Sequence, residues 1–486
     1  METIPQEIFL SILDYVGAFP DELLPYVTVS RRWQYTIERY NFQSLRIENT
    51  ELSTFAELFR PSQIHRKALV KVIDLTVALP APREIGSHQL EEANNQAFSA
   101  AVHKLFQVLE TFNEDREVKK GSGLDLVLKG IYSPSNESRW RTPSGDPLRE
   151  GINAFGGAFI HLLDHEKLPI LKCVSRFYCS RATWSHKIYP ASTMLAACKL
   201  KDLKLCWIHY FNHRECIGNE TLKTMRHDFA RAVSSYIYPL QELRIEFEST
   251  SPLDEATTPP NLISFPNLVD PLNLALHELV QKSSVYGVSF CAQHVVAPEL
   301  FWPYDDVHQL PTPTPFWPNV KRVAMYCSAT TPGGDWYFMA DPSTASRTKS
   351  RGNRAENNRS TGQCCCGKGS GVLHYSGDCV NGYRSVPDPE KMNPLLIAMA
   401  RAIRYAPSLE EIHLKFSQTL TSKYFNESIA RKFDITYFAS GFNRPYAAPP
   451  FEKNRLICDV QNWRPDEEVE RYWRDALGPN GAIVYR

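Results

Sequence analysis

Apolar and polar residues alternate in a series of short runs along most of the chain. In a typical run, Leu243, Ile245 and Phe247 are apolar, the positions between them are polar, and a further apolar residue, Leu240, precedes them. A period of two is typical of a β-strand with one buried face. The pattern predicts strands at 70–77, 200–207, 240–247, 285–290, 320–325 and 409–416, with less regular versions at 42–47, 124–128 and 168–173.

Segments with the spacing of amphipathic helices separate these runs. Apolar residues recur every three or four positions at about 95–112, after Asn219 and at about 467–477. Two further helices are predicted to begin at Asp270–Pro271 and at Asn393–Pro394, because proline is favoured at the first helical position. Strand, connection and helix therefore repeat in that order through the body of the chain.

This repeated order is how a right-handed solenoid is built. Equivalent apolar positions of four consecutive runs, 203, 243, 288 and 323, are 40, 45 and 35 residues apart, whereas regular leucine-rich repeats run about 20–29 residues. The body therefore resembles an irregular leucine-rich-repeat-like α/β solenoid, in which one set of strand residues faces the core and the other faces an open surface. The alternative is an ordinary α/β domain built on a parallel sheet.

The first 48 residues predict a separate unit of three helices. Thr3 and Ser30 are suited to cap the first and third helices, because a hydroxyl at the N-cap accepts a hydrogen bond from the first turn. We expect Ile37 and Tyr40 of the third helix to face the body. About 48 residues cannot comfortably bury a core of their own, so the body or a partner protein is expected to stabilise the unit.

The order of motifs in this unit resembles an F-box. The chain contains, in sequence, the segments 4–8 (IPQEI), 12–13 (IL), 27–33 (VTVSRRW) and 42–45 (FQSL). The F-box pattern is LPxE(L/I)xxxI(L/F), followed after a spacer by V-x-(R/K)-x-W. The chain departs from it at Ile4, where leucine is usual, and at Ser30-Arg31, where Cys-Lys or Cys-Arg is usual. With its proline-rich body, the chain is similar to the large F-box family of filamentous fungi.

This resemblance implies a function. F-boxes are three-helix units that bind the Skp adaptor of SCF (Skp–cullin–F-box) ubiquitin ligases, so residues 1–48 would bind the adaptor and, through it, the cullin. Residues 49–486 would bind an unidentified protein substrate, and the chain would be a substrate-recognition subunit with no enzymatic activity or cofactor of its own. The expected adaptor-binding residues are Ile4, Pro5, Glu7, Ile8, Ile12, Leu13, Val29 and Trp33. An alternative is an F-box protein that acts with the adaptor outside a ligase.

Composition and charge narrow the class of protein. The 486 residues include 54 Lys and Arg and 54 Asp and Glu, so the formal net charge is 0, which argues against a dedicated binder of nucleic acid or of an anionic membrane. No window of about 18 apolar residues is present, and the first residues lack the basic region of a signal peptide. We therefore expect an intracellular protein, cytoplasmic or nuclear, with reduced cysteines. Residues 341–386 are polar and are predicted to form a disordered insert.

One cluster of potential metal ligands offers an enzymatic alternative. Cys206, His209, His213 and Cys216 have spacing similar to that of a zinc site. Residues three apart in a strand face opposite sides of a sheet, however. Cys206 and His209 are therefore expected to separate, and no metal site is predicted.

Two other features are interpreted as structural. Residues 362–368 (GQCCCGK) fit the start of a phosphate-binding loop, but Gly369 stands where Ser or Thr would bind magnesium, and no helix is predicted to follow. Four aromatic residues of the late loops are expected to cover the end of the solenoid rather than to form a recognition patch: Trp302, Trp317, Trp336 and Tyr337.

Overall fold

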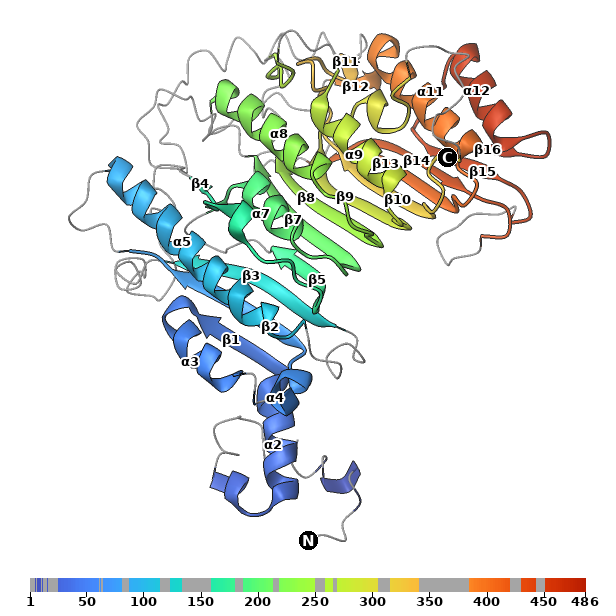
Figure 1. Ribbon diagram of the computed structural model, residues 1–486. Coiled ribbons are helices and arrows are strands. Elements are labelled where there is room, and N and C mark those ends of the chain that lie inside the picture. Colours follow the sequence, from blue (N-terminus) through green and yellow to red (C-terminus); the bar gives the residue numbers. More distant parts are fainter. Residues whose placement is uncertain are drawn as a thin grey trace, which may run out of the picture.

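A twelve-stranded sheet runs through nearly the whole of the computed structural model (Figure 1). The structure describes residues 5, 7–9, 11, 15, 25–60, 62, 64–80, 87–113, 123–132, 159–179, 187–212, 218–249, 258–264, 269–304, 315–340, 384–419, 430–442 and 451–486. The spatial order of the strands follows their order in the chain. They are β1 (Ser44–Glu48), β2 (Val72–Ala78), β3 (Leu124–Tyr132), β5 (Val174–Cys179), β7 (Leu205–Asn212), β8 (Glu242–Ser249), β9 (Gly287–His294), β10 (Arg322–Cys327), β13 (Glu411–Thr419), β14 (Ala430–Phe438), β15 (Arg455–Asp459) and β16 (Ala482–Tyr485).

Most of the sheet is parallel. Every pairing from β1 to β13 is parallel, β14 is antiparallel to both of its neighbours, and β16 is parallel to β15. Two small sheets lie beside it, formed by β4 (Phe159–Ile160) with β6 (Lys187–Ile188) and by β11 (Phe338–Ala340) with β12 (Arg384–Pro387). The predicted insert at 341–386 lies outside the described residues except for its last three, which belong to β12.

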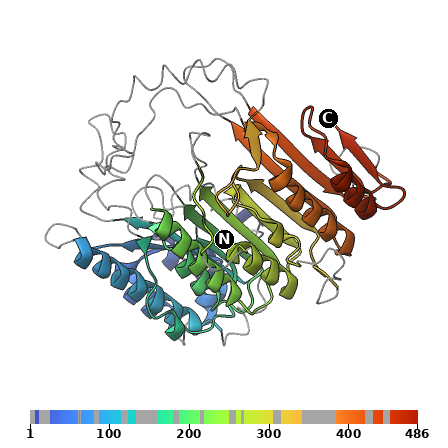
Figure 2. The ribbon, with the colours of Figure 1, turned by 90° about the horizontal axis from the view of Figure 1, so that it is seen from above.

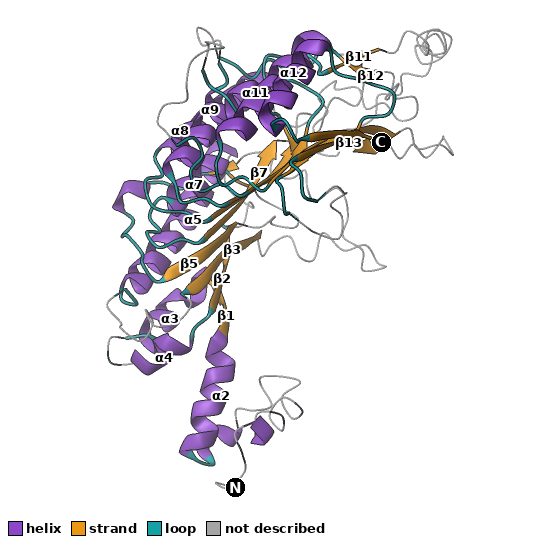
Figure 3. Cartoon of the chain, turned by 90° about the vertical axis from the view of Figure 1, so that its right-hand side faces the viewer, coloured by secondary structure: helices purple, strands orange, loops and turns teal. Residues whose placement is uncertain are grey.

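The helices form a second layer on one face of this sheet. Figure 3 shows them on a single side, and Figure 2 shows the layer following the sheet towards its C-terminal end. They are α5 (Ser87–Glu110), α7 (Pro190–Ala197), α8 (Asn219–Ser234), α9 (Pro271–Lys282), α11 (Pro389–Tyr405) and α12 (Glu467–Leu477), while α2 (Arg31–Gln43), α3 (Leu52–Leu58) and α4 (Ile64–Leu69) lie near β1. No described helix covers the opposite face, which we call the open face.

The one-sided helix layer explains the alternation in the strands. In β10, Val323 and Met325 are buried under the helices, whereas Arg322 and Tyr326 are exposed on the open face. Parallel sheets are usually covered on both faces and then read as continuous apolar runs. Here one face carries no described helix, so the residues on that face are mostly polar and the sequence alternates between apolar and polar positions. The expectation of an α/β fold is confirmed.

Several helix predictions are confirmed, and one is wrong. The C-terminal helix spans Glu467–Leu477 as expected, and α9 begins at Pro271, with the Asp270 carboxylate accepting a hydrogen bond from the Asn273 amide. The helix predicted to start at Asn393–Pro394 instead begins at Pro389, capped by Asp388. Asp388 and Asn393, five residues apart, could each cap a helix, and the structure uses Asp388. Pro394 then lies inside the helix, where its ring nitrogen cannot donate a backbone hydrogen bond, and the helix continues with that one bond missing.

Two strand predictions also need correction. The strand expected at 168–173 is β5, which begins only at Val174. In β7 the predicted alternation has the wrong phase, because Cys206 and Ile208 are buried while Trp207 lies on the open face, 36% exposed. Both faces of β7 carry apolar residues, so the sequence pattern alone could not decide which set points inwards.

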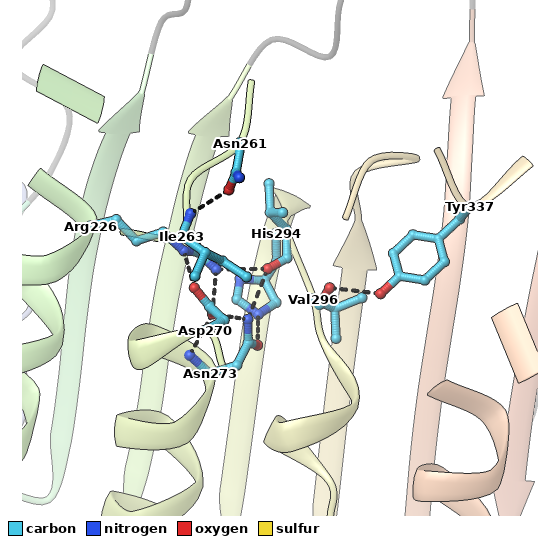
Figure 4. A network of polar contacts seen from close by, with 9 residues as sticks. Arg226, Asn261, Ile263, Asp270, Asn273, His294, Val296 and Tyr337 are labelled. Atoms are coloured by element: carbon cyan, nitrogen blue, oxygen red, sulfur yellow. Dashed lines mark hydrogen bonds and ion pairs between the residues drawn. The ribbon is translucent and has the colours of Figure 1, made fainter. Parts of the chain in front are cut away.

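A buried polar network ties α8, α9 and the loop after β9 together (Figure 4). Arg226 donates from Nε to Asp270 Oδ1 at 2.6 Å and from a terminal nitrogen to Oδ2 at 2.8 Å. Arg226 and Asn273 both donate to the Val295 carbonyl at 3.0 Å, and His294 Nε2 lies 3.0 Å from the Asn273 side-chain oxygen. The side chains of Arg226 and Asp270 are 2% and 0% exposed, so each charge depends on the other.

The ion pair governs the protonation of Asp270. Burial alone would raise the pKa of this carboxyl, but the Arg226 guanidinium and the hydrogen bonds from Asn273 hold it below the ordinary value of 3.8. His294, by contrast, is kept neutral, because burial and the nearby Arg226 charge lower its pKa to about 3. The network therefore consists of one ion pair, Arg226–Asp270, surrounded by neutral hydrogen-bond donors and acceptors.

Replacing Asp270 should destabilise the fold strongly. Asp270→Asn leaves the Arg226 guanidinium buried without its counter-charge, which we expect to lower the free energy of unfolding by about 3–5 kcal/mol. Urea denaturation of the wild type and the variant measures the difference. Glu278→Ala is the matched control, because it breaks the exposed Lys282–Glu278 pair of the same α9 region and should cost less than about 1 kcal/mol. Equal losses in both variants would contradict the importance of the buried pair.

The same ion pair predicts a pH dependence. Because the pKa of Asp270 is lower in the folded chain than its ordinary value of 3.8, its stabilising contribution is present above that value and is lost as the pH falls through the folded-state pKa. The stability difference between wild type and Asp270→Asn should therefore stay constant at neutral pH and shrink below about pH 4. Urea titrations across this range test the trend, and a difference that grew on acidification would refute it.

Candidate functional site

The residues before β1, 1–43, are called the N-terminal segment, and its described part contains a small apolar cluster of its own. Phe9 and Ile37 are buried together, with Val27 and Trp33 packed partly against them. The Phe9 and Trp33 rings meet edge to face, with their centroids 4.9 Å apart. Among the described residues, this cluster is separate from the large core beneath the sheet.

The third predicted helix of this segment is α2. The Ser30 hydroxyl accepts a hydrogen bond from the Trp33 amide at 3.3 Å, as expected for its N-cap. The prediction that Ile37 and Tyr40 face the body is wrong, because Ile37 is buried against Phe9 in the N-terminal cluster and Tyr40 is 42% exposed. Thr36 and Ile37 are the buried residues of α2, and Tyr40, one turn further along the same face, is no longer covered by neighbouring residues.

The expected adaptor-binding residues divide into three groups. Ile8 and Val29 are apolar and 53% and 56% exposed, and Pro5 and Glu7 are exposed as well. Trp33 is half-buried against Phe9 and so supports the segment from within. Ile4, Ile12 and Leu13 lie outside the described residues. The described aliphatic side chains that are exposed here are therefore Ile8 and Val29, and the exposed aromatic side chains include Tyr15, Tyr26 and Tyr35.

The N-terminal segment is joined firmly to the sheet. Helix α2 ends at Gln43 and β1 begins at the next residue, so no loop separates them. Arg66 of α4 donates to Glu38 of α2 at 2.9 Å, and its guanidinium lies over the Phe42 ring. Because β1 pairs with β2, the last five residues of the expected unit 1–48 are part of the sheet.

A second candidate site is a hollow of about 600 Å³ on the open face. Its floor is made of Gly287, Ser289 and Ala324, which lie on β9 and β10. Strand pairing places Arg244 beside Ser289 and His413 beside Ala324. The hollow thus exists because short side chains in the middle strands lie between longer ones on β8 and β13.

Polar side chains on β8 and the residue before β9 form one wall. The Tyr286 hydroxyl donates to Glu242 at 2.9 Å, and Arg244 donates to the other oxygen of Glu242 at 3.3 Å. The Arg244 guanidinium also lies 5.6 Å from the centroid of the Trp207 ring. This wall therefore combines a cation, a carboxylate and one aromatic ring, and Trp207 contacts Arg244 from β7, outside the hollow.

The opposite wall comes from β10, β13 and β14. His413 Nε2 lies 2.9 Å from Asp434 Oδ1, and the Thr436 hydroxyl donates to the same oxygen at 3.2 Å. The Tyr326 ring meets His413 edge to face, with the centroids 5.8 Å apart. The lining continues past this wall to Phe438, Ile457, Asp459 and Arg486, and Phe438 and Ile457 pack against Phe442 and Phe451.

Sequence reasoning missed the hollow altogether. Its residues occupy the polar positions of the alternating runs, which predict strands but carry no motif. The available signal was the succession of small residues at Gly287, Ser289 and Ala324, flanked by charged residues at the matching positions of other runs. Recognising it requires the strand order, which only the structure supplies.

The structure does not assemble the candidate zinc ligands. Cys206 is buried under the helices, whereas His209 lies on the other side of β7, and His213 and Cys216 lie outside the described residues. Burial also raises the pKa of the Cys206 thiol, which disfavours the thiolate that zinc requires. Within the described part of the chain, no group of three or more His, Cys, Asp or Glu residues could hold a metal ion.

The four loop aromatics pack into the interior. Trp302, Trp317, Trp336 and Tyr337 are all buried, and the Tyr337 hydroxyl donates to the Val296 carbonyl at 2.9 Å. Their burial agrees with a packing role rather than a recognition patch, but they do not cover the end of the sheet, because β13, β14, β15 and β16 follow β10.

Comparison with known proteins adds no assignment. No protein-family model matches the chain, and no curated protein matches it significantly. Among the described helices, none is both long enough and apolar enough to cross a membrane. Any functional conclusion must therefore rest on the residues themselves.

Proposed function

We propose that this chain is the substrate-recognition subunit of an SCF-type ubiquitin ligase. In this proposal the N-terminal segment is an F-box that binds the Skp adaptor, and the open face of the body binds a target protein. The observation that carries it is the pairing of two features. A small helical segment with exposed apolar side chains is joined without a loop to a long sheet that has one face bare of helices.

Exposure in the N-terminal segment supports the adaptor interface. Ile8 and Val29 expose more than half of their surface, while Phe9 and Ile37 beside them are buried. Side chains of this kind supply the central anchors of protein interfaces once a partner buries them. Both belong to the segments that resemble the F-box pattern.

The strand order supports a leucine-rich-repeat-like body. In a doubly wound α/β sheet the strand order reverses at one point and helices cover both faces. Here the strands of the sheet lie side by side in the same order as they follow one another along the chain, and the helices lie on one side. This arrangement favours the solenoid over the ordinary α/β alternative and leaves the open face for a target.

In the proposed mechanism this chain holds the target in place and does not itself make or break covalent bonds. Holding a target beside a charged conjugating enzyme raises its effective concentration and makes transfer effectively intramolecular. Such a mechanism needs a fixed geometry between the two binding surfaces. The direct α2–β1 junction and the Glu38–Arg66 contact would provide it.

Co-purification with the Skp adaptor tests the proposal. We expect the full chain to capture the adaptor and the variant Ile8→Asp with Val29→Asp to lose it, because two carboxylates would be buried unpaired in the interface. Ile237→Asp is the matched control, since Ile237 is an apolar residue of the body that is 78% exposed. Point variants are preferable to deletion of 1–48, which would remove β1 from the sheet.

The outcomes are distinct. Loss of adaptor in the double variant but not in Ile237→Asp supports the interface, provided that both variants unfold at the wild-type temperature. Failure of the wild-type chain to capture the adaptor overturns the proposal. Capture of the adaptor without the cullin would place the chain outside a ligase.

A further inference from the structure

The arginines that line the hollow have more unused hydrogen-bond donors than the carboxylates have unused acceptors. A guanidinium has five N–H donors. Arg244 spends one terminal nitrogen on a 3.3 Å bond to Glu242, and Arg322 approaches Glu410 only at 3.8 Å. Their side chains are 45% and 48% exposed. Most of their donors are therefore free of bonds to other described residues.

The carboxylates of the hollow are already engaged. Glu242 accepts bonds from Tyr286 and Arg244, and Asp434 contacts His413 and Thr436. Glu411 and Asp459 take part in interactions of their own. The capacity that remains for a partner is thus mainly cationic.

The two arginines flank the floor of the hollow. Strand pairing places Arg244 beside Ser289 on one side of β9 and Arg322 beside Gly287 on the other. They are two strand spacings apart and offset by two residues, roughly 12 Å in all, so both long side chains can reach a group resting on Gly287 and Ser289. Both arginines also lie close enough to act on Tyr286. The hydrogen bond to Glu242 raises the pKa of the Tyr286 hydroxyl, and the positive charges of Arg322 and Arg244 partly oppose this rise.

We infer that this hollow binds the carboxylate side chain of an Asp or Glu in an extended segment of the target protein. The inference rests on the proposed function and names the chemistry of its target. Glu242 and Glu411 lie in the same row as Gly287 and Arg322, so they disfavour a doubly charged phosphate over a singly charged carboxylate. Trp207 and Tyr326, 36% and 38% exposed, offer apolar contact on either side.

An array of short immobilised peptides tests this inference. Each peptide carries one fixed central residue in a randomised background: Asp, Glu, Asn, Gln, Lys, Arg or phosphoserine. The full chain in complex with the Skp adaptor should bind Asp and Glu peptides roughly tenfold better than Asn and Gln peptides, as expected for a charge-assisted hydrogen bond.

Variants identify the site of the effect. Arg244→Gln with Arg322→Gln should lose the preference for acidic peptides. Arg176→Gln should keep it, because Arg176 is a similarly exposed arginine of the open face that pairs with Asp125 outside the hollow. Thermal unfolding should be unchanged in all three chains, since exposed ion pairs contribute little to stability.

Several results would overturn the inference. They are equal binding of Glu and Gln peptides, a preference for Lys or Arg, stronger binding of phosphoserine, and an unchanged preference in the double variant. Failure of the proposed function is separable, because adaptor capture depends on the N-terminal segment and is measured on the same chains. If the full chain captures no adaptor, the array is run on the chain alone.

Discussion

Parallel strands cannot be joined by a tight hairpin, so each link between neighbouring strands must cross one face of the sheet. In this chain the helices of these crossovers all lie on the same face, and that constraint determines most of the remaining structure. In the parallel strands it buries alternate residues, such as Val323 and Met325 of β10, and leaves the residues between and beside them, such as Arg322 and Tyr326, on the open face. The buried half builds a continuous core, and the free half becomes available for recognition.

The buried polar network fits the same constraint. A helix that crosses the sheet begins near the carboxyl end of the preceding strand, where backbone groups lose their partners. Asp270 caps α9 at this point and also pairs with Arg226 of α8. The network therefore fastens two successive crossovers to each other and to the Val295 carbonyl, where apolar packing alone would leave polar groups unpaired.

The sequence predicts these structures unevenly, for physical reasons. Local signals work well: the hydroxyl of Ser30 and the carboxylate of Asp270 cap the helices they were expected to cap. Signals that depend on tertiary packing fail, as in β7, where Trp207 is apolar yet faces outwards. The hollow could not be predicted, because its floor and walls come from strands that are distant in the chain and meet only through the sheet order. The exposure of Ile8 and Val29 agrees with the expectation that they are free for a partner. Tyr40 shows that helical spacing predicts a shared face but not how far along that face the covering residues extend.

The succession of strands has a consequence for how such a surface can change over time. Each strand of the parallel part contacts only its two neighbours in the sheet, and its outward residues touch little of the buried half. A substitution such as one at Ala324 would reshape the hollow while Val323 and Met325 continue to pack beneath it. Under the proposed function, the residues that would set binding specificity and those that stabilise the fold alternate along the same strand, so the recognised target could change without a change in the core.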